Sequence, residues 1–431
     1  MKRIIIALFA VITLLSINNA YANNYIYTEE KKEEESSIST ISKTPEFNFS
    51  SLSQILIEVS TGKVIYENKA EERILPASVT KVMTMLLTME AIDSGKLSYS
   101  DTITCSANAS KMGGSQIWFK EGETLTVDEA LKAIAVVSAN DVTLAVAEHL
   151  GGTEENFVSM MNEKAKELGM TGTNFENCHG IDSENHYTTA KDISLMAREL
   201  ILKHPDILKY TSIWMDTLRN GTFQLSSTNK LIRYYEGANG LKTGYTTNAR
   251  YNLAASASRN GITFLAVVCS SPSSEERNED AKKLLDFGFA NYEIMILAKN
   301  DEVIESIKVP KSIGKQYDVY TDNVNILNEK GTKIEVEKII ELDDFKAPIT
   351  SESKIGTVKF VEKNNEENIL AVADLIIKDE VEKSGFIDYL TYIFESLANV
   401  SRIWNTNNDN NWNNKMLQFC YKKVMNITNK I

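Results

Sequence analysis

The chain has 431 residues, a formal net charge of −13, 43% hydrophobic residues and 4 cysteines. It is too long for one ordinary domain and too apolar for a disordered chain, and its acidic balance argues against nucleic acid as the main partner, because phosphate binding needs a basic face. The cysteines are scattered and form no C-x-x-C pair, which excludes a disulfide scaffold and argues against a zinc ribbon.

The N-terminus has the three-part pattern of a secretory signal peptide over residues 1–22. Lys2 and Arg3 precede an apolar run, and a small-x-small triplet places the cleavage site after Ala22. A membrane-spanning anchor is the alternative, but the run is shorter than the roughly 20 residues that a helix needs to cross a bilayer. Residues 23–48 are rich in charged residues and serine, so they are predicted to form a disordered tether.

Residues 49–297 mix strand-like and helical patterns and are predicted to form an α+β domain. A hairpin is expected over 54–68, and three further strands over 240–245, 251–258 and 263–270. Apolar residues recur at helical spacing over 79–92, 127–136, 142–150, 156–168, 189–202 and 275–292.

The last part of the chain divides into two segments. Short alternating stretches separated by turn residues predict a small β-sandwich domain over 298–378. Residues 379–431 carry an amphipathic helical stripe from Phe386 to Trp404, and then lysines interleaved with apolar residues. In an exported protein this segment is expected to attach to the outer face of the cell membrane. Packing of two helices on the body or on another subunit is the alternative.

The motif serine-x-x-lysine is weak alone and occurs here at Ser60, Ser78, Ser227, Ser312 and Ser351. Only Ser78-Val79-Thr80-Lys81 opens a long apolar helix. Residues i and i+3 share a helix face, so the Ser78 hydroxyl is expected near the Lys81 amine. A helix N-terminus also stabilises developing negative charge, which makes Ser78 a candidate nucleophile and Lys81 its base. A helix-capping serine is the plain alternative.

Two further motifs carry polar groups suited to a cleft. Ser138-Ala139-Asn140 interrupts two apolar helices, where buried polar groups must satisfy their hydrogen bonds, and a catalytic cleft is one answer. The same letters at 106–108 lie in a polar stretch and predict a plain loop. Lys242-Thr243-Gly244 lies on a predicted strand and suits a peptide carboxylate placed along a strand edge, although a surface strand with a turn has the same pattern.

In this order the three motifs resemble those of the penicillin-recognising serine acyl enzymes. The sequences at 76–81, 138–141, 174–182 and 240–246 narrow the resemblance to the low-molecular-mass penicillin-binding proteins that are D-alanyl-D-alanine carboxypeptidases. The resemblance covers roughly residues 49–375. It implies a β-lactamase-like catalytic domain, in which a helical cluster flanks an antiparallel sheet, and no cofactor is expected.

The resemblance also implies the reacting groups. Ser78 would attack the carbonyl between the two terminal D-alanines of a peptidoglycan stem peptide. Lys81 would take the serine proton, and Ser138 would relay protons. The backbone N–H groups of Ser78 and Tyr245 would form the oxyanion hole. Penicillins mimic the D-Ala-D-Ala end and would trap Ser78 as a slow acyl enzyme.

The same resemblance assigns the groups that bind the substrate. Asn140 would orient the substrate amide. Lys242 and Thr243, followed by Gly244, would hold the terminal carboxylate. Arg277 matches the family arginine that assists there.

Three other functions use the same motifs or fold. A serine β-lactamase shares the motifs, but no Glu-x-x-Leu-Asn sequence lies between Asn140 and Lys242, and such an enzyme would not need the extra β domain. A D,D-endopeptidase uses the same residues and stays open. A non-catalytic cell-wall or spore scaffold is the alternative from another class, and the intact motifs argue against it.

Some residues depart from the family pattern or suggest other chemistry. Ala139 and Arg250 stand where the family usually has glycine; neither removes a reacting group, and Arg250 is expected near the mouth of the cleft. Cys178, His179 and His186 raise the question of a metal. No further ligand stands nearby at the usual spacing, so no metal site is expected.

Overall fold

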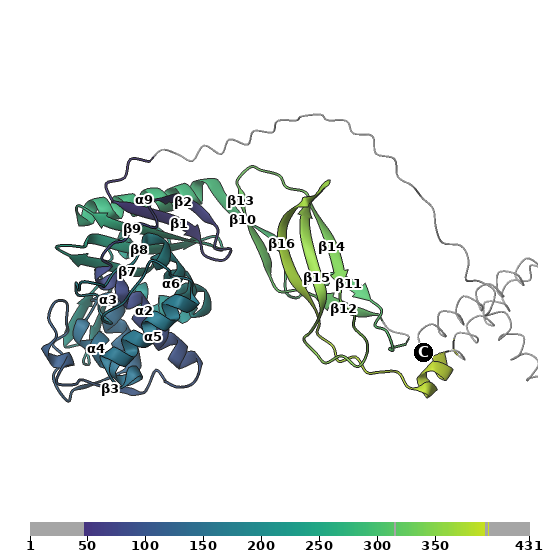
Figure 1. The fold of residues 1–431 in the computed structure, drawn as a ribbon, viewed down its shortest axis with the longest axis horizontal. Helices are drawn as coiled ribbons and strands as arrows, with labels where there is room; N and C mark the ends of the chain where they lie inside the picture. Colours follow the sequence, from purple (N-terminus) through teal and green to yellow (C-terminus); the bar gives the residue numbers. More distant parts are fainter. Residues whose placement is uncertain (1–46, 314–315, 393–394, 396–431) are drawn as a thin grey trace, which may run out of the picture. The chain divides into compact units, whose positions relative to one another are not determined.

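The computed structural model of the protein describes residues 47–313, 316–392 and 395 (Figure 1). The predicted signal peptide, nearly all of the predicted tether and most of the predicted amphipathic segment lie outside these residues. Within 379–431, residues 386–392 are helical, and Phe386 and Ile387 are exposed. None of the helices in these described ranges combines the length and hydropathy needed to cross a membrane.

A five-stranded antiparallel sheet organises the first part of the described chain. Its strands lie in the order β2 (Val64–Asn68), β1 (Ser53–Glu58), β9 (Ile262–Ser271), β8 (Arg250–Arg259) and β7 (Ala238–Thr246). The predicted hairpin over 54–68 and the three later strands therefore belong to one sheet. Strand β7, which carries the Lys-Thr-Gly motif, lies at its edge.

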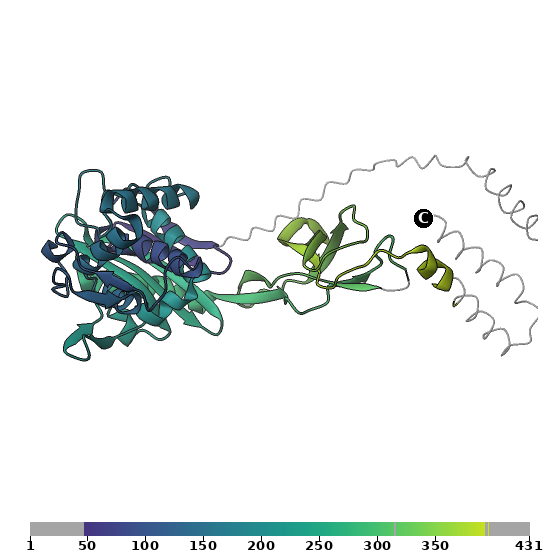
Figure 2. The same cartoon turned by 90° about the horizontal axis from the view of Figure 1, so that it is seen from below.

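The sheet is buried on both faces because side chains alternate along each strand. On β9, Leu265, Val267 and Cys269 face one apolar core, whereas Phe264 and Val268 face the other. The second core is completed by Leu284 and Leu285 of α9 (Ser274–Asn291). Figures 1 and 2 show α9 on one face of the sheet and the helical cluster on the other. This arrangement confirms the predicted α+β class.

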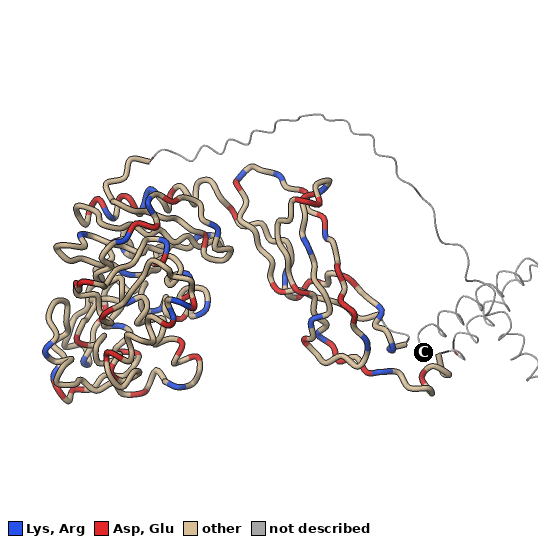
Figure 3. The backbone as a smooth tube through the Cα atoms, in the orientation of Figure 1, with Lys and Arg blue, Asp and Glu red and all other residues tan. Residues whose placement is uncertain are grey.

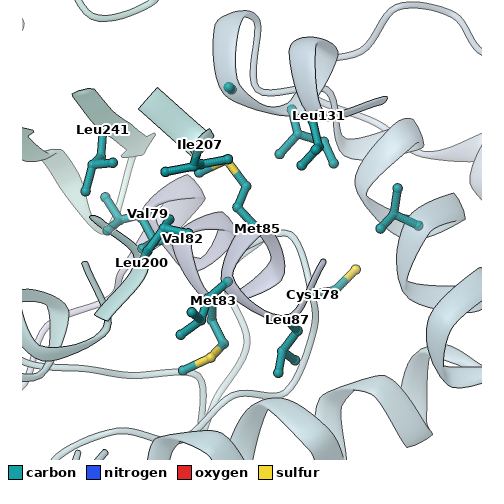
Figure 4. Close-up of a cluster of buried hydrophobic side chains, with 14 of the residues drawn as sticks. Val79, Val82, Met83, Met85, Leu87, Leu131, Cys178, Leu200, Ile207 and Leu241 are labelled. Carbon is teal, nitrogen blue, oxygen red and sulfur yellow. The ribbon is translucent and has the colours of Figure 1, made fainter. Parts of the chain in front are cut away.

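The helical cluster is built around α2 (Lys81–Asp93), whose residues from Lys81 to Met89 are all buried. Val82, Met83 and Met85 of α2 lie in a buried cluster that also contains Leu131, Leu200, Ile207 and Leu241 (Figure 4). Because α2 is enclosed on every side, it shows no polar face, and the predicted one-sided stripe understates its burial. The surrounding helices are α3 (Val127–Val136), α4 (Asn140–Gly151), α5 (Glu154–Glu167), α6 (Ala190–Lys203), α7 (Leu208–Thr211) and α8 (Leu231–Tyr234).

Short elements that the sequence did not predict complete this part. Two small hairpins pair β3 (Thr102–Thr104) with β4 (Thr124–Thr126), and β5 (Met215–Leu218) with β6 (Phe223–Ser226). The 3₁₀ turns are η2 (Ala77–Thr80), η3 (Ala109–Lys111) and η4 (Pro205–Ile207). Three-residue strands carry too little periodicity to stand out in a sequence.

The later part of the described chain is all β, as its alternating segments predicted. One sheet has the order β11 (Glu305–Ile307), β12 (Tyr317–Tyr320), β16 (Asn365–Ile377), β15 (Ser353–Glu362) and β14 (Val336–Leu342). A second pairs β10 (Tyr292–Ala298) with β13 (Val324–Glu329). Residues 292–298 were not predicted as a strand. Acidic and basic residues are interspersed throughout the described chain (Figure 3).

Candidate active site

Ser78 lies in the η2 turn that leads directly into α2. The buried side chain of Asn252 holds this turn, because its Nδ2 donates to the carbonyls of Leu75 (2.8 Å) and Pro76 (3.1 Å). Asn252 Oδ1 accepts from the backbone N–H of Ser270 at 2.8 Å. One amide therefore ties the nucleophile turn to two strands of the sheet.

The edge strand β7 approaches the same turn at Gly244. A Cβ atom at Gly244 would lie 2.7 Å from the Pro76 carbonyl oxygen and 3.1 Å from the Val79 nitrogen. Only glycine permits this approach. It places the backbone of the next residue, Tyr245, beside the turn that carries Ser78, where the predicted oxyanion hole requires it.

Lys81 has three hydrogen-bond partners at its amine. Its Nζ lies 3.1 Å from Ser78 Oγ, 2.6 Å from Asn140 Oδ1 and 2.6 Å from the carbonyl oxygen of His179. Asn140 Nδ2 donates to the Gly113 carbonyl at 2.7 Å, which fixes the amide with its oxygen toward the lysine. Both Asn140 Oδ1 and the His179 carbonyl can only accept, so they use two N–H groups of the amine.

This pattern suits a base. A neutral lysine amine has two N–H groups and one lone pair, and the two acceptors leave the lone pair for the Ser78 hydroxyl. The lysine is fully buried, and burial lowers its pKa to about 7, although nearby Cys178 and Asp141 act in the opposite direction. A substantial neutral fraction is therefore present at neutral pH.

Ser138 occupies the break between α3 and α4 with a left-handed backbone, at φ 63°. Its Oγ is buried and has no hydrogen-bond partner in the described chain. Such an unpartnered hydroxyl in a strained residue is typical of a functional site. The structure brings Asn140 onto Lys81 but gives Ser138 no hydrogen bond to either residue. Ala139 has φ −59°, which explains why alanine is accepted where the family usually has glycine.

The Lys-Thr-Gly motif is buried within the edge strand β7. Lys242 is buried and its Nζ donates to the Thr243 carbonyl at 2.9 Å. Burial, and then the positive charges of Lys81 and Arg277, hold the pKa of Lys242 well below its ordinary value. The hydroxyl of Thr243 lies 2.7 Å from that of Thr228. A bound carboxylate would meet two buried basic side chains and two hydroxyls here.

Two further predicted site residues are Arg277, on α9, and Tyr245, which follows the motif on β7. Arg277 is buried, and burial lowers its pKa to about 10. Its guanidinium donates to Asn278 Oδ1 at 3.0 Å. The Tyr245 side chain is exposed and stacks on Tyr251 with ring centroids 4.3 Å apart. Arg250 is exposed at the first position of β8, with φ 58°, a conformation that favours glycine.

The residues that raised the question of a metal are arranged differently from what the sequence spacing indicated. His186 Nε2 lies 2.8 Å from Thr80 Oγ1. Glu154 of α5 brings a third donor to Cys178 and His179, so that one ligand atom of each lies within 4.8 Å of the others. The described cysteines, Cys105, Cys178 and Cys269, are free and buried.

The comparisons with known proteins agree with this geometry. The family Peptidase_S11, described as D-alanyl-D-alanine carboxypeptidase, matches residues 38–273. The D-alanyl-D-alanine carboxypeptidase DacF of Bacillus subtilis is 43% identical over 81% of this chain and 90% of its own. The chain belongs to the D-alanyl-D-alanine carboxypeptidase family. It is a serine-type carboxypeptidase, which confirms the predicted activity.

Solved structures of other family members agree with the membership. Penicillin-binding protein 5 from Haemophilus influenzae is 28% identical, with a TM-score of 0.67, over 79% of this chain and 99% of its own. Penicillin-binding protein D2 from Listeria monocytogenes, solved in an ampicillin-bound form, is 31% identical, with a TM-score of 0.53, over 57% of this chain and 99% of its own. The resemblance drawn from the three motifs is thus confirmed at the level of family and fold.

Proposed function

We propose that this carboxypeptidase removes the terminal D-alanine from peptidoglycan pentapeptide stems through an acyl-enzyme on Ser78. The observation that carries the proposal is the placement of Lys81 Nζ between Ser78 Oγ, at 3.1 Å, and two acceptor-only oxygens, each at 2.6 Å. This placement leaves the amine one direction in which to accept a proton, and that direction is the serine hydroxyl.

In the acylation step, Ser78 Oγ bonds to the carbonyl carbon of the penultimate D-alanine and its proton passes to Lys81 Nζ. The backbone N–H groups of Ser78 and Tyr245 bind the resulting oxyanion. The carbon–nitrogen bond then breaks, and the terminal D-alanine takes up a proton at nitrogen and leaves. The unpartnered hydroxyl of Ser138 is suited to pass that proton from Lys81 to the leaving nitrogen.

Substrate selection rests on the terminal carboxylate. Lys242, Thr243 and Arg277 are buried, and the two basic side chains have no acidic hydrogen-bond partner among the contacts described above. A carboxylate placed there neutralises charges that would otherwise be costly to bury. Asn140 orients the substrate amide while it also holds Lys81.

Deacylation returns the enzyme to its starting state. Water adds to the carbonyl carbon of the Ser78 ester and one of its protons passes to Lys81. The bond from that carbon to Ser78 Oγ then breaks, Ser78 Oγ takes the proton back from Lys81, and the shortened peptide leaves as an acid that gives its proton to solvent. A β-lactam that enters the same site would acylate Ser78 and would be released slowly, so we expect penicillin to inhibit.

We also propose that the enzyme is exported and attached to the outer face of the cell membrane. The support comes from the signal-peptide pattern over 1–22 and the amphipathic, lysine-bearing segment over 379–431.

The activity proposal is tested with the full exported chain and a fluorescent penicillin. Peptide mapping should place the adduct on Ser78, and D-alanine should be released from a pentapeptide. Both should disappear in Ser78→Ala and persist in Ser351→Ala, whose serine belongs to another Ser-x-x-Lys sequence and is exposed. An adduct on another residue, or D-alanine release by Ser78→Ala, would refute the assignment of the nucleophile.

A further inference from the structure

The carbonyl of His179 holds the base Lys81 in place, and the carboxylate of Glu154, on α5, contacts His179 and the residue before it. Lys81 Nζ donates to the His179 carbonyl at 2.6 Å. The preceding residue, Cys178, donates its backbone N–H to Glu154 Oε1 at 3.1 Å. The same carboxylate oxygen lies 3.5 Å from His179 Nε2. The carbonyl belongs to the His179–Gly180 peptide; Glu154 holds the His179 imidazole and the backbone N–H of the preceding residue.

The other contacts of this segment leave Glu154 a distinct task. Asn177 Oδ1 accepts from the backbone N–H groups of His179 (3.3 Å) and Gly180 (2.6 Å), and so fixes the far side of the segment. Thr84 Oγ1 donates to the Cys178 carbonyl at 2.6 Å. The backbone N–H of Cys178 has Glu154 as its acceptor, so this carboxylate anchors the segment before His179, whereas Asn177 anchors the His179–Gly180 peptide that faces Lys81.

A metal is the competing occupant, because a carboxylate, a thiol and an imidazole are ligands that zinc accepts. The hydrogen bonds favour a network without one. The backbone N–H of Ile181 donates to His179 Nδ1 at 3.2 Å, which places the imidazole proton on Nε2, toward Glu154. A metal at Nε2 would displace that proton to Nδ1, where it would face the N–H of Ile181.

We propose that Glu154 is a positioning residue for the carboxypeptidase reaction, which acts on Lys81 by fixing the place of Cys178 and His179. This inference rests on the proposed role of Lys81 as the base. Without the carboxylate, the Cys178 N–H and the His179 imidazole lose their shared partner and His179 can shift. The lysine amine that its carbonyl holds can then rotate and present an N–H group to Ser78 instead of its lone pair. Acylation then slows, whereas binding of the peptide carboxylate at Lys242 and Thr243 is unchanged.

The test compares Glu154→Ala, Glu154→Gln and Glu155→Ala in the full chain. Glu155 lies in the same first turn of α5, is exposed, and carries the same charge, so its variant controls for the loss of charge at the helix start. Each rate is divided by the number of active sites titrated with a fluorescent penicillin under prolonged incubation, so that a misfolded fraction does not count.

We expect Glu154→Ala to lower kcat for D-alanine release, and the rate of penicillin acylation, about 10- to 100-fold, with KM within about twofold of the wild type. Glu154→Gln keeps an acceptor for the Cys178 N–H and should recover most of the rate. Glu155→Ala should match the wild type. A Glu154→Ala enzyme with unchanged kcat per titrated site, or a Glu154→Gln enzyme as slow as Glu154→Ala, would overturn the proposal.

A zinc titration of the metal-free wild type decides between the two occupants. Stoichiometric Zn²⁺ binding that is lost in Glu154→Ala would overturn the assignment in favour of a metal site, whereas no binding supports the hydrogen-bonded network. Failure of the proposed function would appear differently, as a penicillin adduct away from Ser78 in the wild type itself.

Discussion

Asn140 Oδ1 lies 2.6 Å from Lys81 Nζ, and the hydrogen bond from Asn140 Nδ2 to the Gly113 carbonyl prevents the amide from facing the lysine with its nitrogen. The second motif of the family thus contacts the lysine of the first directly. A neutral acceptor at this position satisfies the lysine without stabilising its charged form as strongly as a carboxylate would.

The Asn140→Asp variant tests this relationship. A carboxylate beside Lys81 favours the ammonium form and should raise the pKa of Lys81 by about 1 or more. The acid limb of penicillin acylation would move to higher pH, and the rate at neutral pH would fall. Asn108→Asp is the matched control, because Asn108 ends the identical Ser-Ala-Asn triplet at 106–108 but is exposed. An unchanged acid limb in Asn140→Asp would contradict the role given to Asn140.

The carboxylate pocket predicts a second pH dependence, in KM. Lys242 has a pKa well below its ordinary value because it is buried near Lys81 and Arg277. Above that pKa the free enzyme loses the charge that attracts the substrate carboxylate, so KM for a D-Ala-D-Ala peptide should rise with pH. Steady-state kinetics from acid to alkaline pH measure this. Lys242→Arg should keep its charge and remove the rise, even if KM starts higher; a KM independent of pH in the wild type would refute the prediction.

Asn252 predicts a loss of both stability and activity. Replacing it by alanine removes the donor to the Leu75 and Pro76 carbonyls and leaves the buried Ser270 N–H without its acceptor. We expect the free energy of unfolding to fall by about 2–3 kcal/mol, measured by urea denaturation, and acylation per active site to slow because the Ser78 turn loosens. Asn248→Ala removes an exposed asparagine from the same hairpin and should change neither by a comparable amount. Equal effects of the two variants would contradict the account.

Much of the fold was readable because its patterns are local. The helix over 127–136 and the strands of the central sheet follow from hydrophobic periodicity, and their observed bounds agree within a few residues. Strand β10 was missed, because the helical pattern of α9 runs up to Tyr292 and hides the change of structure there. Strand β10 pairs with β13, which lies further along the chain, and hydrophobic periodicity carries no information about which strands pair.

The candidate site divides in a similar way. Ser78, Lys81, Asn140, Lys242 and Thr243 were found because they belong to motifs with recognisable spacing. Asn252, Thr228 and Glu154 were not found, because each acts through a contact between distant segments. The contact of Lys81 with the His179 carbonyl could not be predicted, because this carbonyl is a backbone group that any residue type could supply. The roles of the site residues stay predictions until the variants are measured.

The most direct test of the central claim, that buried Lys81 is the base for Ser78, is the pH dependence of Ser78 acylation by a fluorescent penicillin. Burial lowers the pKa of Lys81 to about 7. Below that value the lysine is protonated and cannot accept the serine proton, so the acylation rate constant should rise with pH and level off above an apparent pKa of about 7. A rate constant that stays flat across the acid and neutral range would contradict the account.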